Sequence, residues 1–120
     1  MKTQHRTASV GLAVAALFSS TAVLAQTVVR IGHVAPMTGG IAHLGKDNEN
    51  GAKLAIADLN KAGLTIGGQK VRFELLSEDD AADPKQGTAA AQKLVDAKVA
   101  GVIGHLNSGT TIPASTLYNR

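Results

Sequence analysis

Segments with strand character alternate with helical segments along this chain, and that order limits the fold more than any other feature. Short runs rich in β-branched residues cover residues 28–34, 70–76 and 99–103, each bounded by Gly, Pro or acidic residues. Between these runs, apolar residues recur with helical spacing. The order β-α-β-α-β-α predicts an α/β fold, with a parallel sheet, helices on both of its faces and right-handed crossovers.

The first helix is predicted over residues 44–61. Its apolar positions include Ala52, Ala55 and Ile56, which follow one face of a helix, and Gly63 ends it. Residues 64–70, "LTIGGQK", are interpreted as a turn-rich link into the second strand.

The second helix is predicted to begin with Asp83 as its N-cap. Pro84 suits the first helical position, and Gln86 completes the spacing of a capping box. A third helix is expected to begin near Thr110, with Pro113 tolerated in its first turn.

The N-terminus has the pattern of a secretory signal peptide. A basic start precedes an apolar run over residues 8–18, and Val23 and Ala25 occupy the −3 and −1 positions of a cleavage site. A transmembrane anchor is the alternative, but the run is shorter than the roughly 20 residues that span a bilayer. Residues 1–25 are therefore expected to be removed on export, after Ala25.

Without that segment the chain is close to neutral. The 120 residues carry a formal net charge of +3, but two of the twelve Lys and Arg lie before residue 26, which leaves ten basic and nine acidic residues. No basic face with interleaved aromatic residues predicts binding to nucleic acid. Cysteine is absent, which excludes disulfides and thiolate chemistry. The last residues lie in a predicted helix without a stop signal, so we expect the N-terminal part of a longer protein.

Residues 104–111, "GHLNSGTT", resemble the phosphate-binding pattern G-x-x-x-x-G-K-[ST], with Thr110 in place of the lysine. Without the lysine a nucleotide site is disfavoured. A helix start with free N–H groups and the hydroxyls of Ser108, Thr110 and Thr111 suits one carboxylate. The alternative is that Ser108 or Thr110 only caps its own helix, and the spacing leaves both open.

Other patterns predict no metal, cofactor or catalytic site. The acidic residues 78–83 lack calcium-loop spacing and are interpreted as a solvated turn, and His33, His43 and His105 form no zinc motif, which favours structural or surface roles. Ser108 lies outside a G-x-S-x-G elbow, and the glycine-rich loop after the first strand lacks a dinucleotide fingerprint. A nucleotide-using or hydrolytic α/β enzyme is therefore the disfavoured alternative.

Four stretches in order resemble one known family. These stretches are "VRIGHVAPMTGG", "GAKLAIADLNKAGL", "EDDAADPKQGTAAAQKLV" and "VIGHLNSGTTIPAS". Together they resemble the periplasmic substrate-binding proteins of branched-chain amino-acid ABC transporters, the leucine/isoleucine/valine-binding proteins.

The resemblance implies a type I periplasmic-binding fold, in which two lobes close on a ligand and residues 26–120 form the first part of lobe 1. It implies that Ser108 hydrogen-bonds the ligand's α-carboxylate, with Asn107, Thr110 and Leu44 as further ligand-binding residues. It also implies a monomeric, non-enzymatic receptor for a branched-chain or related amino acid, with a membrane permease as its partner and no cofactor.

Two departures from the family pattern bear on these expectations. Some members pair cysteines at the positions of Ala82 and Asn107, and both are missing here. Some place an aromatic residue against the ligand where this chain has Leu44, which leaves the identity of the ligand open. A sensory ligand-binding domain of the same fold is the alternative function.

Overall fold

The computed structural model describes residues 26–119, so the predicted signal peptide lies outside the described residues. The elements in chain order are β1 (Thr27–Ala35), α1 (Ala42–Ala62), β2 (Thr65–Ile66), β3 (Gln69–Asp79), α2 (Pro84–Asp96), β4 (Gly101–Gly104) and α3 (Ser108–Tyr118). The predicted alternation of strands and helices is confirmed, with β2 as an additional short strand.

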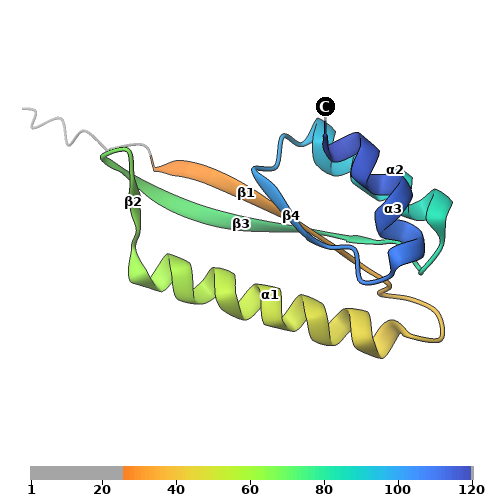
Figure 1. The fold of residues 1–120 in the computed structure, drawn as a ribbon. Coiled ribbons are helices and arrows are strands. Elements are labelled where there is room, and N and C mark those ends of the chain that lie inside the picture. The colour runs from red at the N-terminus through yellow and green to blue at the C-terminus, as the bar shows by residue number, and fades with distance from the viewer. Residues whose placement is uncertain (1–25, 120) are drawn as a thin grey trace, which may run out of the picture.

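The sheet has the order β2-β3-β1-β4, and β3, β1 and β4 run parallel. Helix α1 covers one face, and α2 and α3 lie together over the other (Figure 1). The register pairs Ala35 of β1 with Asp79 of β3, and Val34 with Gly104 of β4. The three parallel strands therefore end level with one another, and the loops that follow them meet at one edge of the sheet.

The core lies between the sheet and α2. Val34 of β1 packs with Ala90 and Leu94 of α2, and Leu76 and Val102 border them. Burial of a leucine such as Leu94 contributes roughly 1.5–3 kcal/mol. Gly32 of β1 makes this packing possible, because a Cβ atom there would lie 2.7 Å from Leu94 Cδ1.

Strand β2 corrects the interpretation of residues 64–70 as a link only. Thr65 pairs antiparallel with Lys70, and Ile66 with Gln69, so the segment is a β-hairpin. Gly67 and Gly68, at φ +58° and +81°, form its two-residue turn. Successive positive φ angles match the right-handed twist of a hairpin and favour glycine. A two-residue strand is too short to produce a periodic sequence signal.

Four predicted boundaries were wrong by two or three residues. Helix α1 begins at Ala42, not at residue 44, and β3 continues to Asp79, not to residue 76. Strand β4 begins at Gly101, not at residue 99, because the Val99 N–H donates to the Leu94 carbonyl and so ties Val99 to the end of α2. Helix α3 begins at Ser108, not at Thr110.

The start of α2 follows the prediction in part. The Asp83 side chain accepts a hydrogen bond from the Gln86 N–H at 2.9 Å, and Pro84 is the first helical residue. The reciprocal bond of a capping box is not made. The Asp83 N–H instead donates to the Asp80 carbonyl at 2.7 Å, so the Gln86 side chain is not needed there.

Candidate functional site

The candidate site lies where the chain leaves β1 and β4 in opposite directions. After β1 the chain passes to α1 on one face of the sheet, and after β4 it passes to α3 on the other (Figure 1). Between two such neighbouring strands the loops diverge, and α/β sheets bind ligands beyond the carboxyl ends at such a position, which we call the crevice. The starts of α1 and α3 border this crevice.

The start of α3 offers unused hydrogen-bond donors. The N–H groups of Thr110 and Thr111 donate to the Asn107 carbonyl, at 3.1 and 2.9 Å. Within residues 26–119, the Ser108 hydroxyl and the N–H groups of Ser108 and Gly109 have no hydrogen-bond acceptor. Ser108 is exposed. Free N–H groups at the positive end of a helix dipole, with an adjacent hydroxyl, can hold a carboxylate.

The capping alternative is wrong for both residues considered. The N-cap is Asn107, in extended conformation and without a side-chain cap bond, and Ser108 is the first helical residue. Asn107 Oδ1 is buried with no hydrogen-bond partner among the described residues. The Ser108 hydroxyl is therefore free for another partner.

Thr110, which is expected to bind ligand, packs against α2, and a contact of this residue with ligand stays a prediction. Its side chain is fully buried and faces Gly87 of α2. Its hydroxyl donates to the Asn107 carbonyl at 2.9 Å. Since that hydroxyl is already used inside the helix, Thr110 supports the loop from within.

Leu44 lies in the first turn of α1 and is 48% exposed. It therefore starts from the same edge of the sheet as Ser108, but on the opposite face. Gly45 next to it must be a glycine, because a Cβ atom there would overlap the Pro36 carbonyl. This close approach fixes the start of α1 against the loop after β1. A contact between Leu44 and ligand stays a prediction.

The acidic segment after β3 is not the solvated turn that its composition indicated. Asp79 Oδ1 accepts from the N–H groups of Met37 and Ala81, at 2.7 and 2.8 Å, and Oδ2 accepts from the Thr38 hydroxyl at 2.6 Å. Burial by itself raises the pKa of Asp79, but the bonds from Thr38, Ala81 and Met37 together lower it below its usual value. Asp79 thus ties the loop after β1 to the end of β3.

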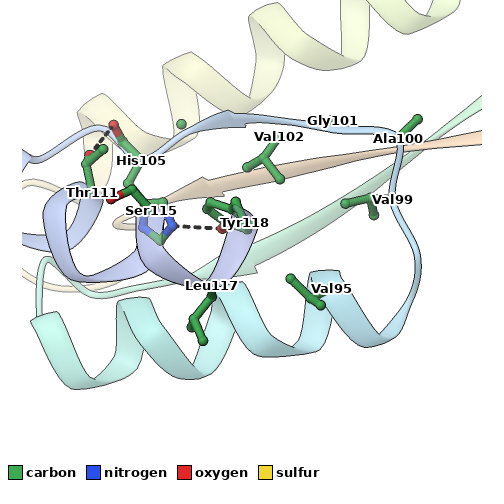
Figure 2. Close-up of a pocket in the computed structure, with 11 residues that line it drawn as sticks. Val95, Val99, Ala100, Gly101, Val102, His105, Thr111, Ser115, Leu117 and Tyr118 are labelled. Atoms are coloured by element: carbon green, nitrogen blue, oxygen red, sulfur yellow. Dashed lines mark hydrogen bonds between the residues drawn. The ribbon is translucent and has the colours of Figure 1, made fainter. Parts of the chain in front are cut away.

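Asp80 is fully buried and pairs with His105, with 3.0 Å between Asp80 Oδ2 and His105 Nδ1. The other ring nitrogen of His105 lies 3.0 Å from the Tyr118 hydroxyl of α3 (Figure 2). The predicted structural role of His105 is confirmed, but sequence reasoning missed both partners. The available signal was the position of Asp79 and Asp80 directly after a long strand, where side chains meet neighbouring loops.

The hollows in the structure do not coincide with this crevice. One of about 420 Å³ lies beside β4, between the last turns of α2 and α3, and is lined by Val95, Val99, Tyr118 and their neighbours (Figure 2). Another of about 350 Å³ lies between α1 and the sheet and includes Ile56 and Ile103. Both flank β4, which pairs only with β1 among the described strands. The second is lined by apolar residues and glycine. The first also includes His105, Thr111 and Tyr118, but these three hydrogen-bond to one another.

Two further observations concern residues 26–119. They contain no cluster of three or more His, Asp or Glu side chains that could hold a metal ion. Every helix among them falls short of the length and apolarity that a membrane span requires.

Comparisons with known proteins agree with this fold. The profile of the periplasmic binding protein family matches residues 28–120. The Leu/Ile/Val-binding protein BraC3 of Rhizobium johnstonii is 45% identical over 92 residues, which cover 77% of this chain and 24% of BraC3.

Two solved structures share the fold. The branched-chain amino acid transporter substrate-binding protein LivJ from Streptococcus pneumoniae, in complex with isoleucine, has a TM-score of 0.68 at 28% identity, over 78% of this chain and 26% of LivJ. The second is a solute-binding protein of an ABC transporter from Rhodopseudomonas palustris, in complex with 3,4-dihydroxybenzoic acid. It has a TM-score of 0.61 at 36% identity, and the match covers 75% of this chain and 24% of the Rhodopseudomonas chain.

The chain thus spans about a quarter of the length of these relatives. The expected type I periplasmic-binding fold is confirmed for the part that it covers. Since the family profile covers 93 of the 120 residues and two solved relatives share the fold, the chain belongs to the periplasmic binding protein family.

Proposed function

We propose that this chain belongs to an exported solute receptor that captures a branched-chain or related amino acid and delivers it to the permease of an ABC transporter. The observation that carries the proposal is the start of α3, where the Ser108 hydroxyl and two N–H groups are free beside the crevice. These groups bind the ligand's carboxylate. The receptor performs no covalent chemistry and acts as a monomer.

The proposed site covers only one side of the ligand. The chain's own residues supply donors for a carboxylate, but no acidic side chain is free at the start of α3 to meet an ammonium group. We propose that a second lobe supplies that group and closes over the ligand. Leucine and 3,4-dihydroxybenzoate both carry a carboxylate, so the start of α3 serves either class, and the second lobe selects between them.

Titration calorimetry on the complete protein tests this proposal. Leucine, isoleucine and valine should bind, whereas leucinamide, which lacks the carboxylate, should bind at least about tenfold more weakly because a charge-assisted hydrogen bond is lost. 3,4-Dihydroxybenzoate serves as the competing ligand class. Equal binding of leucine and leucinamide would contradict the carboxylate site.

Family membership implies export to the periplasm. We propose in addition that residues 1–25 are a signal peptide cleaved after Ala25. Mass spectrometry of periplasmic protein should then find Gln26 at the N-terminus, and recovery of an intact Met1 terminus would contradict the cleavage site.

A further inference from the structure

A chain of three hydrogen-bonded polar side chains, two buried and one partly buried, links the loops beneath the crevice to the far end of α3. It consists of Asp80 after β3, His105 after β4 and Tyr118 in the last turn of α3. The Asp80 and His105 side chains are both fully buried. The distances are 3.0 Å from Asp80 Oδ2 to His105 Nδ1 and 3.0 Å from His105 Nε2 to the Tyr118 hydroxyl.

The hydrogens of this chain follow from the chemistry of its members. A carboxylate only accepts, so the His105 Nδ1 carries a hydrogen and donates it to Asp80. In a neutral imidazole the Nε2 then accepts from the Tyr118 hydroxyl. Burial, followed by the charge of Asp80, raises the pKa of Tyr118 to about 12, so the hydroxyl keeps its proton at neutral pH. All three side chains are therefore satisfied in a single arrangement.

His105 is also anchored through its backbone. The Thr111 hydroxyl donates to the His105 carbonyl at 3.2 Å and to the Asn107 carbonyl at 2.8 Å. Figure 2 shows the bonds from His105 to Thr111 and to Tyr118. Only Leu106 and Asn107 separate His105 from Ser108. His105 is thus held by Asp80 and Tyr118 through its ring and by Thr111 through its carbonyl, at the entry of the chain into α3.

Asp80 connects the same chain to the rest of the edge. Its Oδ1 accepts from the Ala82 N–H at 3.0 Å, and its carbonyl accepts from the Asp83 N–H at the start of α2. Its N–H donates to the Ala35 carbonyl at the end of β1. Through Asp80 and His105, α3 is therefore connected by hydrogen bonds to the ends of β1, β3 and β4.

We propose that Asp80, His105 and Tyr118 are positioning residues, which hold the start of α3 so that the Ser108 hydroxyl and the adjacent N–H groups meet a ligand carboxylate. This inference rests on the proposed function, because it assigns the three residues to the same site. None of the three touches the ligand. Their effect is transmitted through the geometry of Ser108, since binding groups must be held close to their productive positions by buried hydrogen-bonded neighbours.

The test compares Tyr118→Phe, Ser108→Ala and the double variant in the complete protein, by calorimetry with leucine at a temperature where all variants are folded. Tyr118→Phe removes one hydroxyl and keeps the ring. It should weaken leucine binding about three- to tenfold in the parent background, and by less than about twofold in Ser108→Ala, because neighbouring residues that act together are not additive. Ser115→Ala, on α3 but outside the chain of Asp80, His105 and Tyr118, is the matched control and should leave the affinity unchanged.

His105→Asn provides an independent variant. Its amide can replace Nδ1 as a donor to Asp80 but cannot reach Tyr118, so it should reproduce the affinity of Tyr118→Phe. The ¹⁵N spectrum of His105 supplies a second readout: the Nε2 signal should shift in Tyr118→Phe, because its hydrogen-bond partner is lost, and should stay unchanged in Ser115→Ala.

The outcomes separate this inference from the proposed function. If Ser108→Ala leaves leucine affinity unchanged, the carboxylate site is wrong, and the positioning role fails with it. If Ser108→Ala weakens binding while Tyr118→Phe lowers only thermal stability, the site stands and the positioning role is overturned. Additive losses in the double variant would also overturn it.

Discussion

Among single residues, Ser108 has the clearest expected effect on binding. In the complete protein, Ser108→Ala should weaken leucine binding about ten- to a hundredfold, because hydrogen bonds to charged groups contribute roughly 1.5–3 kcal/mol. The helix itself should not be destabilised, since the N-cap is Asn107 and the Ser108 hydroxyl makes no hydrogen bond within residues 26–119. Calorimetry and urea unfolding on the same samples measure both effects.

Ser115→Ala is the control for this substitution as well. Ser115 lies on the same helix, exposed, with its hydroxyl bonded to the Ile112 carbonyl. It should leave the affinity unchanged. If both variants lose affinity equally, the loss reflects the helix and not a contact of Ser108.

Asp79 should make the stability of the protein depend on pH in the acid range. Its pKa is lowered in the folded state, so its stabilising effect is present above its unfolded pKa of about 3.9 and is lost as the pH falls through the folded value. Asp79→Asn should cost about 1–3 kcal/mol at pH 7 through weakened bonds to Thr38 and the two backbone N–H groups. Urea unfolding from pH 7 to 3 should show a smaller decline for the variant than for the parent. Parallel declines would show that Asp79 has the same pKa in both states.

At the scale of elements, the start of α2 depends on one side chain. Asp83→Ala removes the acceptor of the Gln86 N–H and should lower the free energy of unfolding by about 1 kcal/mol. Asp83→Asn retains a capping oxygen and should cost much less. Gln86→Ala should cost little, because no reciprocal bond from that side chain is made. Urea denaturation of the three variants measures these differences, and a large loss in Gln86→Ala would contradict the half-formed capping box.

At the scale of the whole molecule, residues 26–120 alone should bind leucine far more weakly than the complete protein. They supply one side of the proposed site, and the edge of β4 away from β1 is unpaired among the described strands. An unpaired edge favours association between copies, and exposed apolar side chains such as Leu54 and Ile112, 65% and 70% exposed, add to this. Size-exclusion chromatography should show aggregation.

Calorimetry on the same fragment tests the two-lobe arrangement. It should detect no leucine binding at concentrations that saturate the complete protein. Binding by residues 26–120 as tight as that of the complete protein would contradict a site shared between two lobes.

The amino-acid sequence by itself determined the features that depend on near neighbours in the chain. The alternation of strands and helices, the end of α1 at Gly63 and the start of α2 at Asp83 were all predicted. Helical periodicity, an N-cap and a glycine stop each involve residues within about one or two turns, so the sequence displays them directly. The loop at residues 104–111 was also visible as a segment that leads into a helix start.

Only the tertiary structure decided how neighbouring polar residues divide their roles. Ser108 and Thr110 look alike in sequence, but α2 buries Thr110 while Ser108 stays exposed. Asp79 and Asp80 look like a solvated pair, but their partners are Thr38 and His105, which lie 41 and 25 residues away. Such partners come from loops that a parallel sheet gathers at one edge, and their distance along the chain removes any local signal of the contact.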